Sequence, residues 1–187
     1  MSQTIYLSFH DSIHLDSANR FMMMCSQIIQ QYHPSTLYVL LSSGGGAVDS
    51  GVTLYNYLRA LPCTVVTHNI GSIDSIATAV FLAGEKRYAT PNSVFLFHGV
   101  MWGFAQGANL TYSQMKEQLS RFDAAEKLFA GIIVERTCFE ASAVRKLFRQ
   151  GQSKDPIFAK SKGVVHEVCE VSVEPGAPML TVPHEGT

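Results

Sequence analysis

The sequence lacks the features that direct a protein to a membrane or to a polyanion. No apolar run is long enough to cross a bilayer, and the opening MSQTIYLSFHDS has neither the basic start nor the apolar core of a secretory leader. Basic and acidic residues number 14 and 15, so the net charge of -1 gives no general attraction to nucleic acid. We therefore predict a cytoplasmic protein that binds neither membranes nor nucleic acids.

Cysteine is also scarce, and its four copies are scattered without a C-x-x-C pair. This spacing suggests neither a zinc site nor a disulfide framework, so we expect buried, inert thiols and no metal or other cofactor. The sequence shows no internal repeat and no low-complexity linker. A length of 187 residues suits one core, and we predict a single domain over residues 1–187.

What the sequence does contain is a series of short apolar strands that alternate with helices. A first helix is predicted over residues 16–31, capped by Asp16 or Ser17, and a strand covered on both faces follows at residues 36–41. A second helix over residues 47–61 leads into another buried strand. This order predicts an α/β fold with largely parallel strands and right-handed crossovers.

One long helix dominates the second half of the predicted fold. After a short helix and two short strands, it runs from Thr111 to about Arg136. Its apolar seam, which Glu126 interrupts, faces either the domain's own core or another subunit. The remaining elements are helices at residues 139–149 and 156–162, a strand at 163–168 and a tail at 174–187 that is expected to be loose.

Three segments at strand ends or helix starts are placed to carry chemistry: residues 42–51 (SSGGGAVDSG), 71–79 (GSIDSIATA) and 91–99 (PNSVFLFHG). Functional groups of open parallel sheets gather beyond the carboxyl ends of the strands, so these loops are expected to meet in one crevice. The glycines of the first loop suit an oxyanion or a phosphate, or form only a tight turn. The absence of G-K-[ST] and G-x-G-x-x-G weighs against a nucleotide.

Two residues in these loops suit acyl transfer. Ser75 lies at a predicted helix start after a glycine turn, where its hydroxyl points outward or merely caps the helix. His98 ends an apolar strand and is either a general base or a hydrogen-bonded structural residue. Together with paired main-chain amides, these residues supply a nucleophile, a base and an oxyanion site.

The three segments resemble, in the same order, motifs of the Clp protease proteolytic subunits, and the resemblance covers most of the chain. SSGGG is similar to the family's N-S-P-G-G loop, which implies Gly45 as one oxyanion donor. GSIDSIAT is similar to the nucleophile segment, which implies Ser75 as the nucleophile and Ile76 as the second donor. PNSVFLFH is similar to the family's P-N-S-x-x-x-x-H segment, which implies His98 as the general base.

The resemblance also implies a fold and an assembly. The fold is a spiral of βαβ units with a protruding handle, made of a strand and the long helix over about residues 98–136. Members of the family stack through the handle into double rings that enclose a proteolytic chamber. A homo-oligomeric ring is therefore expected, and the seam of the long helix becomes a candidate interface.

The sequence departs from the family pattern in two places. Ungapped alignment places Gly151 at the catalytic aspartate, and the nearest acid, Asp155, is either the third triad member or the cap of the next helix. The family's axial segment before the first strand is missing, which argues against docking of an ATPase unfoldase. Peptides and unfolded polypeptides are then the expected substrates.

The sequence supports three hypotheses of function, of which the first is favoured. It is a serine endopeptidase, a hydrolase of small or unfolded polypeptides that uses Ser75, His98 and the amides of Gly45 and Ile76. The second is a catalytically impaired ring subunit with a structural or regulatory role, suggested by Gly151. The third is a crotonase-type acyl-CoA enzyme, which shares the spiral fold but fits the short chain and the serine and histidine positions less well.

Overall fold

In the computed structural model, which describes residues 3–101, 103 and 109–184, eight strands form one sheet. Its main path runs β6-β5-β3-β2-β1-β8, and β4 and β7 extend it from β3. All neighbouring strands are parallel except β5 and β6. The strands are β1 (Thr4–His10), β2 (Thr36–Ser43), β3 (Thr64–Asp74), β4 (Lys86–Ala89), β5 (Val94–Leu96), β6 (Ser153–Lys154), β7 (Glu167–Val168) and β8 (Met179–Thr181).

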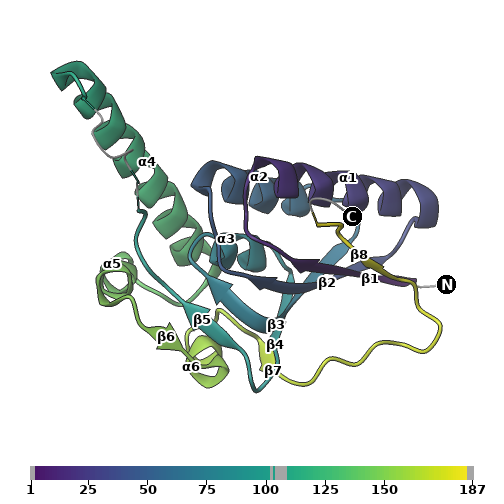
Figure 1. Ribbon diagram of the computed structural model, residues 1–187. Helices are drawn as coiled ribbons and strands as arrows, with labels where there is room; N and C mark the ends of the chain where they lie inside the picture. Colours follow the sequence, from purple (N-terminus) through teal and green to yellow (C-terminus); the bar gives the residue numbers. More distant parts are fainter. Residues whose placement is uncertain (1–2, 102, 104–108, 185–187) are drawn as a thin grey trace.

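The helices connect the strands, and α1 and α2 lie together over one face of the sheet (Figure 1). Inward residues of β1 and β2 are fully buried beneath them, and the Phe9 ring meets Phe21 of α1 edge to face. The predicted α/β class is thus confirmed. The helices are α1 (Leu15–Tyr32), α2 (Val48–Arg59), α3 (Ala77–Leu82), α4 (Tyr112–Arg136), α5 (Ala141–Gln150) and α6 (Pro156–Ser161).

The start of α1 differs from the sequence prediction. The cap is His14, whose side chain accepts a hydrogen bond from the Ser17 N–H, while the Ser17 hydroxyl accepts from the His14 N–H. Ser17 therefore takes part in a reciprocal capping box from the third helical position, and Asp16 lies in the first turn. A histidine cap gives little sequence signal, because Ser, Thr, Asp and Asn are the usual cap residues.

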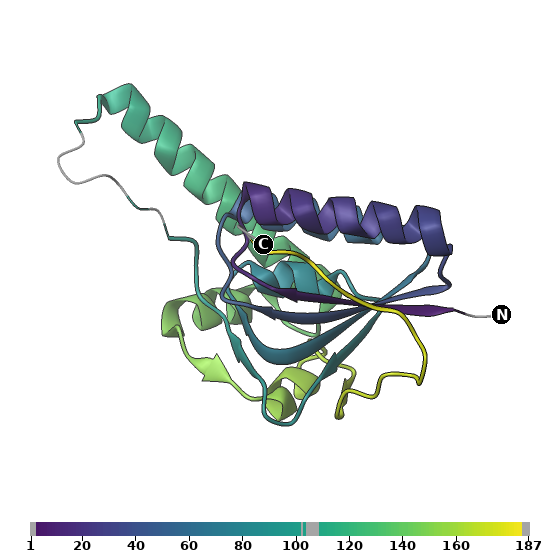
Figure 2. The same cartoon turned by 45° about the vertical axis from the view of Figure 1, so that its right-hand side comes forward.

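Helix α4 projects from the body of the molecule in both views (Figures 1 and 2). Thr111 caps it through a capping box with Gln114, so the predicted start is confirmed. The base of the helix is buried through Ala125, Phe129, Ile132 and Ile133, whereas its outer part is exposed. The preceding strand of the predicted handle falls partly on residues 102 and 104–108, outside the described residues.

A buried arginine holds the base of α4 to the body. Arg87 of β4 is 5% exposed and donates hydrogen bonds to the carbonyls of Gly84, Arg136, Gly163 and Val164, at 2.9 to 3.1 Å for three of them and 2.8 Å for Val164. Burial lowers the pKa of Arg87 to about 10, so the guanidinium remains charged at neutral pH. The Arg87 side chain thus joins the carboxyl-terminal ends of α3, α4 and α6.

The tail differs from the loose segment predicted for residues 174–187. Met179–Thr181 form β8, which pairs in parallel with β1 at Tyr6, Leu7 and Ser8. The strand is short and lies at the sheet edge, so its sequence carries little alternation, and its partner is distant in the chain. Residues 185–187 lie outside the described part.

The cysteines also differ from expectation, because Cys25 alone of the four is buried and Cys138 is exposed. Cys138 lies in the turn between α4 and α5, where the chain runs at the surface. Within the described residues, the helices include none that is long and apolar enough to cross a membrane.

Candidate active site

Ser75 occupies a strained turn between a strand and a helix. It follows β3 directly and has φ +55°, a left-handed conformation that is unusual for a residue with a side chain. Such conformations cost about 1–3 kcal/mol and cluster at functional sites. A sharp strand-to-helix turn also lifts a serine hydroxyl clear of the sheet, the geometry that nucleophilic serines use on other α/β folds.

The glycine loop after β2 packs directly against Ser75. A Cβ atom placed on Gly45, which has φ +83°, would lie 2.7 Å from both the Asp74 carbonyl oxygen and the Ser75 Cβ. The same position is 3.4 Å from the Ile76 nitrogen. Only glycine allows this approach, so the loop and the start of α3 form one main-chain surface around Ser75.

The glycine loop is held in place by the segment before α1. The Ile13 N–H donates to the Gly45 carbonyl at 2.8 Å, and the Ala47 N–H donates to the Ile13 carbonyl at 2.7 Å. Gly46 passes so close to Ile13 that an added Cβ would overlap its carbonyl. The loop is therefore fixed on two sides, by Ile13 and by the Ser75 turn.

The two predicted oxyanion donors differ in their present hydrogen bonding. Ile76 is the N-cap residue of α3, so its N–H precedes the hydrogen bonds of the helix itself. The Gly45 N–H donates to the Ser43 hydroxyl at 3.2 Å, near the long end of the usual range. Gly45 must exchange this neutral, long hydrogen bond for one to a substrate before it acts as a donor.

His98 leaves the sheet beside Ser75. Strands β3 and β5 pair in parallel with Asp74 opposite Leu96, and the Ser75 N–H donates to the Leu96 carbonyl at 2.8 Å. His98 follows two residues after Leu96 at the same edge of the sheet, and its side chain is half-buried. The topology thus brings the carboxyl ends that carry Ser75 and His98 together.

The His98 ring has a defined hydrogen bond. Its Nδ1 lies 2.7 Å from the Gly99 carbonyl oxygen. A carbonyl only accepts, so Nδ1 carries the proton and Nε2 keeps its lone pair. This is the tautomer that a general base needs in order to take a proton from a serine.

The position of the missing aspartate is visible in the fold. Gly151, with φ +54°, is the C-cap of α5, and its N–H donates to the Leu147 carbonyl. The antiparallel pairing of β5 with β6 ends at Leu96 and Ser153, so Gly151 lies two residues before the start of the strand that pairs with β5. A Cβ atom on Gly151 would meet nothing within 4 Å, so a side chain has room at this position.

Asp155 is engaged elsewhere. Its Oδ1 accepts a hydrogen bond of 2.6 Å from the Phe158 N–H, and Pro156 occupies the first turn of α6. Of the two interpretations that the sequence left open for Asp155, the geometry supports the helix cap.

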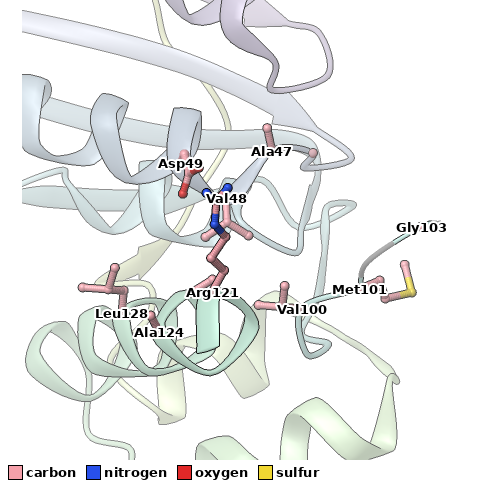
Figure 3. A pocket seen from close by; sticks show the side chains of 11 residues that line it. Ala47, Val48, Asp49, Val100, Met101, Gly103, Arg121, Ala124 and Leu128 are labelled. Atoms are coloured by element: carbon pink, nitrogen blue, oxygen red, sulfur yellow. The ribbon is translucent and has the colours of Figure 1, made fainter. Parts of the chain in front are cut away.

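A cavity of about 530 Å³ opens beside the glycine loop, between the start of α2 and the side of α4 (Figure 3). Its wall is mostly apolar, and the Arg121 side chain extends across it toward Val48 and Asp49. Sequence reasoning did not single out Arg121, which needs the packing of α4 against α2 to be placed here. The lining residues of this cavity include Gly46, Val48, Asp49, Arg121 and Leu128.

Comparison with known proteins decides the family. A family model described as Clp protease matches residues 1–172. The chain belongs to the Clp protease family. Proteins of this family form oligomeric rings and work with Clp ATPases, and the family supports the serine endopeptidase class expected from the sequence.

Three curated relatives carry the name of an ATP-dependent Clp protease proteolytic subunit. Subunit 2 of Borreliella burgdorferi is 27% identical over 140 residues, which cover 74% of this chain and 69% of the relative. Subunit 1 of Leifsonia xyli is 31% identical over 103 residues, 54% of this chain and 50% of the relative. Subunit 2 of Pseudomonas aeruginosa is 26% identical over 115 residues, 57% of each chain. The match thus spans about half of the last two relatives.

Proposed function

We propose that this Clp protease family member is a serine endopeptidase in which Ser75 is the nucleophile, His98 the general base, and the N–H groups of Gly45 and Ile76 the oxyanion donors. The contact of Gly45 with the strained Ser75 turn carries this proposal, because it assembles nucleophile and donors from separate segments. The hydrogen bond from His98 to Gly99 supports it by leaving Nε2 free to act as a base.

The proposed reaction proceeds through an acyl enzyme. His98 Nε2 takes the proton of the Ser75 hydroxyl while Oγ bonds to the peptide carbonyl carbon, and the developing oxyanion accepts from Gly45 and Ile76. The His98 proton then passes to the departing amine, and the peptide C–N bond breaks. Water, deprotonated by His98, cleaves the ester and restores the Ser75 hydroxyl.

The cavity beside the glycine loop suits the substrate side chain next to the scissile bond. Gly46 and Val48 line it on the side of the nucleophile, and Leu128 and Arg121 line it from α4. Apolar walls favour apolar side chains, and the polar part of the wall consists of Asp49 and of Arg121, which is paired with Glu117 at 2.7 Å. Peptides and unfolded polypeptides are the proposed substrates, because a short extended segment can enter such an open site.

The proposed assembly is a homo-oligomeric ring, with one domain per chain and a handle over about residues 98–136. Large apolar side chains on the outer part of α4 support this, since Met115 is 50% exposed and Leu119 is 61% exposed. The relatives are named as ATP-dependent. We propose an ATPase partner and a cytoplasmic location for this chain.

Labelling with a fluorophosphonate probe tests the nucleophile. The wild-type protein should react, and Ser75→Ala should lose labelling altogether because the attacking oxygen is gone. Ser113→Ala, a change at an exposed serine of α4, is the matched control and should label at the wild-type rate. Folded, assembled wild-type protein that takes no label would refute the proposal.

The second candidate is a ring subunit without its own turnover. The specific observations that favour it are the glycine at residue 151, where the family has its catalytic aspartate, and the use of Asp155 as a helix cap. It predicts normal assembly without labelling of Ser75. Sedimentation combined with the labelling experiment therefore distinguishes the two candidates.

A further inference from the structure

We propose that Glu126 of α4 replaces the absent aspartate as the carboxylate that stabilises charged His98, a role that rests on the serine peptidase mechanism proposed above. Glu126 would be a positioning residue, since it acts on His98 and does not touch the substrate. Sequence alignment does not suggest it, because Glu126 belongs to a different segment from Gly151.

The Glu126 carboxylate lies against the peptide that follows His98. A Cβ atom placed on Gly99 would be 3.4 Å from Glu126 Oε2. Gly99 is also the residue whose carbonyl accepts the His98 Nδ1 proton at 2.7 Å. The imidazole and the carboxylate therefore both lie next to Gly99, and a side chain on Gly99 would crowd the carboxylate.

The packing of α4 on α5 explains this location. Phe129 of α4 stacks on Phe148 of α5 with ring centroids 5.1 Å apart, and the Gly99 N–H donates to the Phe148 carbonyl at 3.4 Å. Glu126 precedes Phe129 by three residues, so both side chains lie on the same face of the helix. The stacking of Phe129 on Phe148 thus positions α4 against α5 so that Glu126 lies next to Gly99.

The chemistry of the site calls for a negative charge here. The Gly99 carbonyl fixes the tautomer of neutral His98, but it carries no full charge to stabilise the imidazolium that forms when Ser75 is deprotonated. Asp155 is held by the Phe158 N–H. Glu126 is half-buried within an otherwise apolar seam, and no hydrogen bond to its carboxylate is found among the described residues.

Other charged groups share the groove in which Glu126 lies. Asp123, Lys127 and Glu135 of α4 and Arg145 of α5 line the same cavity between the two helices. A purely structural role for Glu126 would be attraction to Arg145 or Lys127. Such a role predicts that removing those cations has the same effect as removing Glu126, whereas a positioning role does not.

The first experiment measures the rate constant of fluorophosphonate labelling of full-length protein as a function of pH. Glu126→Gln should lower the limiting rate by about tenfold or more and move the inflection due to His98 to lower pH, because loss of the anion destabilises the imidazolium. Glu126→Asp should keep part of the rate. Glu135→Gln and Arg145→Gln are the matched controls and should keep the wild-type rate and inflection.

The second experiment supplies a carboxylate at the family's own position. Gly151→Asp has room for a side chain, and aspartate tolerates the left-handed conformation better than most residues. In the Gly151→Asp background, Glu126→Gln should lower the labelling rate less than it does in the wild type, because the new carboxylate stabilises charged His98. This comparison also keeps the proposal testable if the single Glu126→Gln variant folds poorly.

The outcomes separate this proposal from the mechanism on which it rests. A wild-type rate and an unchanged pH inflection in Glu126→Gln, or an equal loss in Arg145→Gln, would overturn the role of Glu126 and leave the peptidase mechanism intact. An unlabelled wild-type protein, or labelling that persists in Ser75→Ala, would instead overturn the mechanism itself.

Discussion

At the scale of single residues, the candidate site depends on the backbone conformations of Gly45 and Ser75. Gly45 and Ser75 both have positive φ. They pack so closely that a side chain on Gly45 would collide with Ser75. Their contact brings the main chain of Gly45 and Ile76 next to the Ser75 side chain. The proposed oxyanion site is thus built from backbone, and its Gly45 N–H must first leave the Ser43 hydroxyl.

This arrangement predicts a sharp difference between two adjacent glycines. Gly45→Ala should lower the labelling rate of Ser75 by about 100-fold or more, because its methyl group would displace the Ser75 turn and an oxyanion donor with it. Gly44→Ala is the control, since a Cβ there meets nothing within 4 Å. Equal rates in the two variants would show that Gly45 is not part of the site.

Most of the candidate site was predictable at this scale, because Gly45, Ser75, Ile76 and His98 lie in short motifs that depend on local sequence. The cap formed by Asp155 was one of two local alternatives. Glu126 could not be assigned from sequence, since its relation to Gly99 depends on how α4 packs on α5. The only sequence signal was a charge within an apolar seam.

At the scale of elements, α4 has two parts with different surroundings. Its base is packed into the core through Phe129, which is 1% exposed, and its outer part presents Leu119, which is 61% exposed. Helical periodicity predicted one seam along the whole helix. Periodicity identifies the apolar face of a helix but not what packs against it. The structure was therefore needed to show that this face is buried at the base of α4 and exposed in its outer part.

Two substitutions in α4 should therefore have different effects, one on stability and one on subunit association. Phe129→Ala should lower the free energy of unfolding by about 3–5 kcal/mol through loss of buried contacts, as measured by urea denaturation. Leu119→Glu should leave that free energy within about 0.5 kcal/mol but weaken subunit association, as measured by sedimentation velocity. Unchanged sedimentation in Leu119→Glu would remove the outer part of α4 from the proposed interface.

The helices and β2 were also predicted well because each has local periodicity and terminators, whereas β3 runs on to Asp74 through the residues that were predicted as a glycine turn before Ser75. Helix α4 begins within one residue of its predicted start, and β2 extends the predicted strand by two residues, to Ser43. Strand β8 was missed because its pairing with β1 joins opposite ends of the chain. Three residues at a sheet edge carry too little pattern to be recognised alone.

At the scale of the whole molecule, an aromatic cluster around buried His68 links β2, β3 and β4 to the segment that follows β7. Tyr38, His68 and Tyr88 have ring centroids 5.8 to 6.3 Å apart. The His68 Nε2 lies 3.1 Å from the Cys169 carbonyl, which only accepts, so Nε2 donates to it. When His68 is neutral, its Nδ1 accepts from the Tyr38 hydroxyl at 2.7 Å. Burial of the ring favours this neutral form.

The network gives the stability of the whole fold a dependence on pH. Burial lowers the pKa of His68 below its ordinary value of 6.5, so the unfolded chain binds this proton more readily than the folded chain. The free energy of unfolding should be at its full value above about pH 6.5 and should fall as the pH drops below it, by up to about 1.4 kcal/mol per pH unit for this group.

Urea denaturation at pH 7.5, 6.0 and 5.0 measures this dependence. In His68→Gln, which keeps a donor for Cys169 but does not titrate, the decline between pH 7.5 and 5.0 should be smaller than in the wild type. An identical decline in both proteins would mean that other groups cause it.

The four carbonyl contacts of Arg87 make α4 an arm that is fixed at its root and free at its tip. Arg121 and Glu126 lie part-way along this arm, one facing the cavity beside the glycine loop and the other facing Gly99. A load applied at the tip, such as contact with a second subunit, would therefore act on Arg121 before it meets the packed base, which begins at Ala125. Assembly would then adjust the width of the cleft.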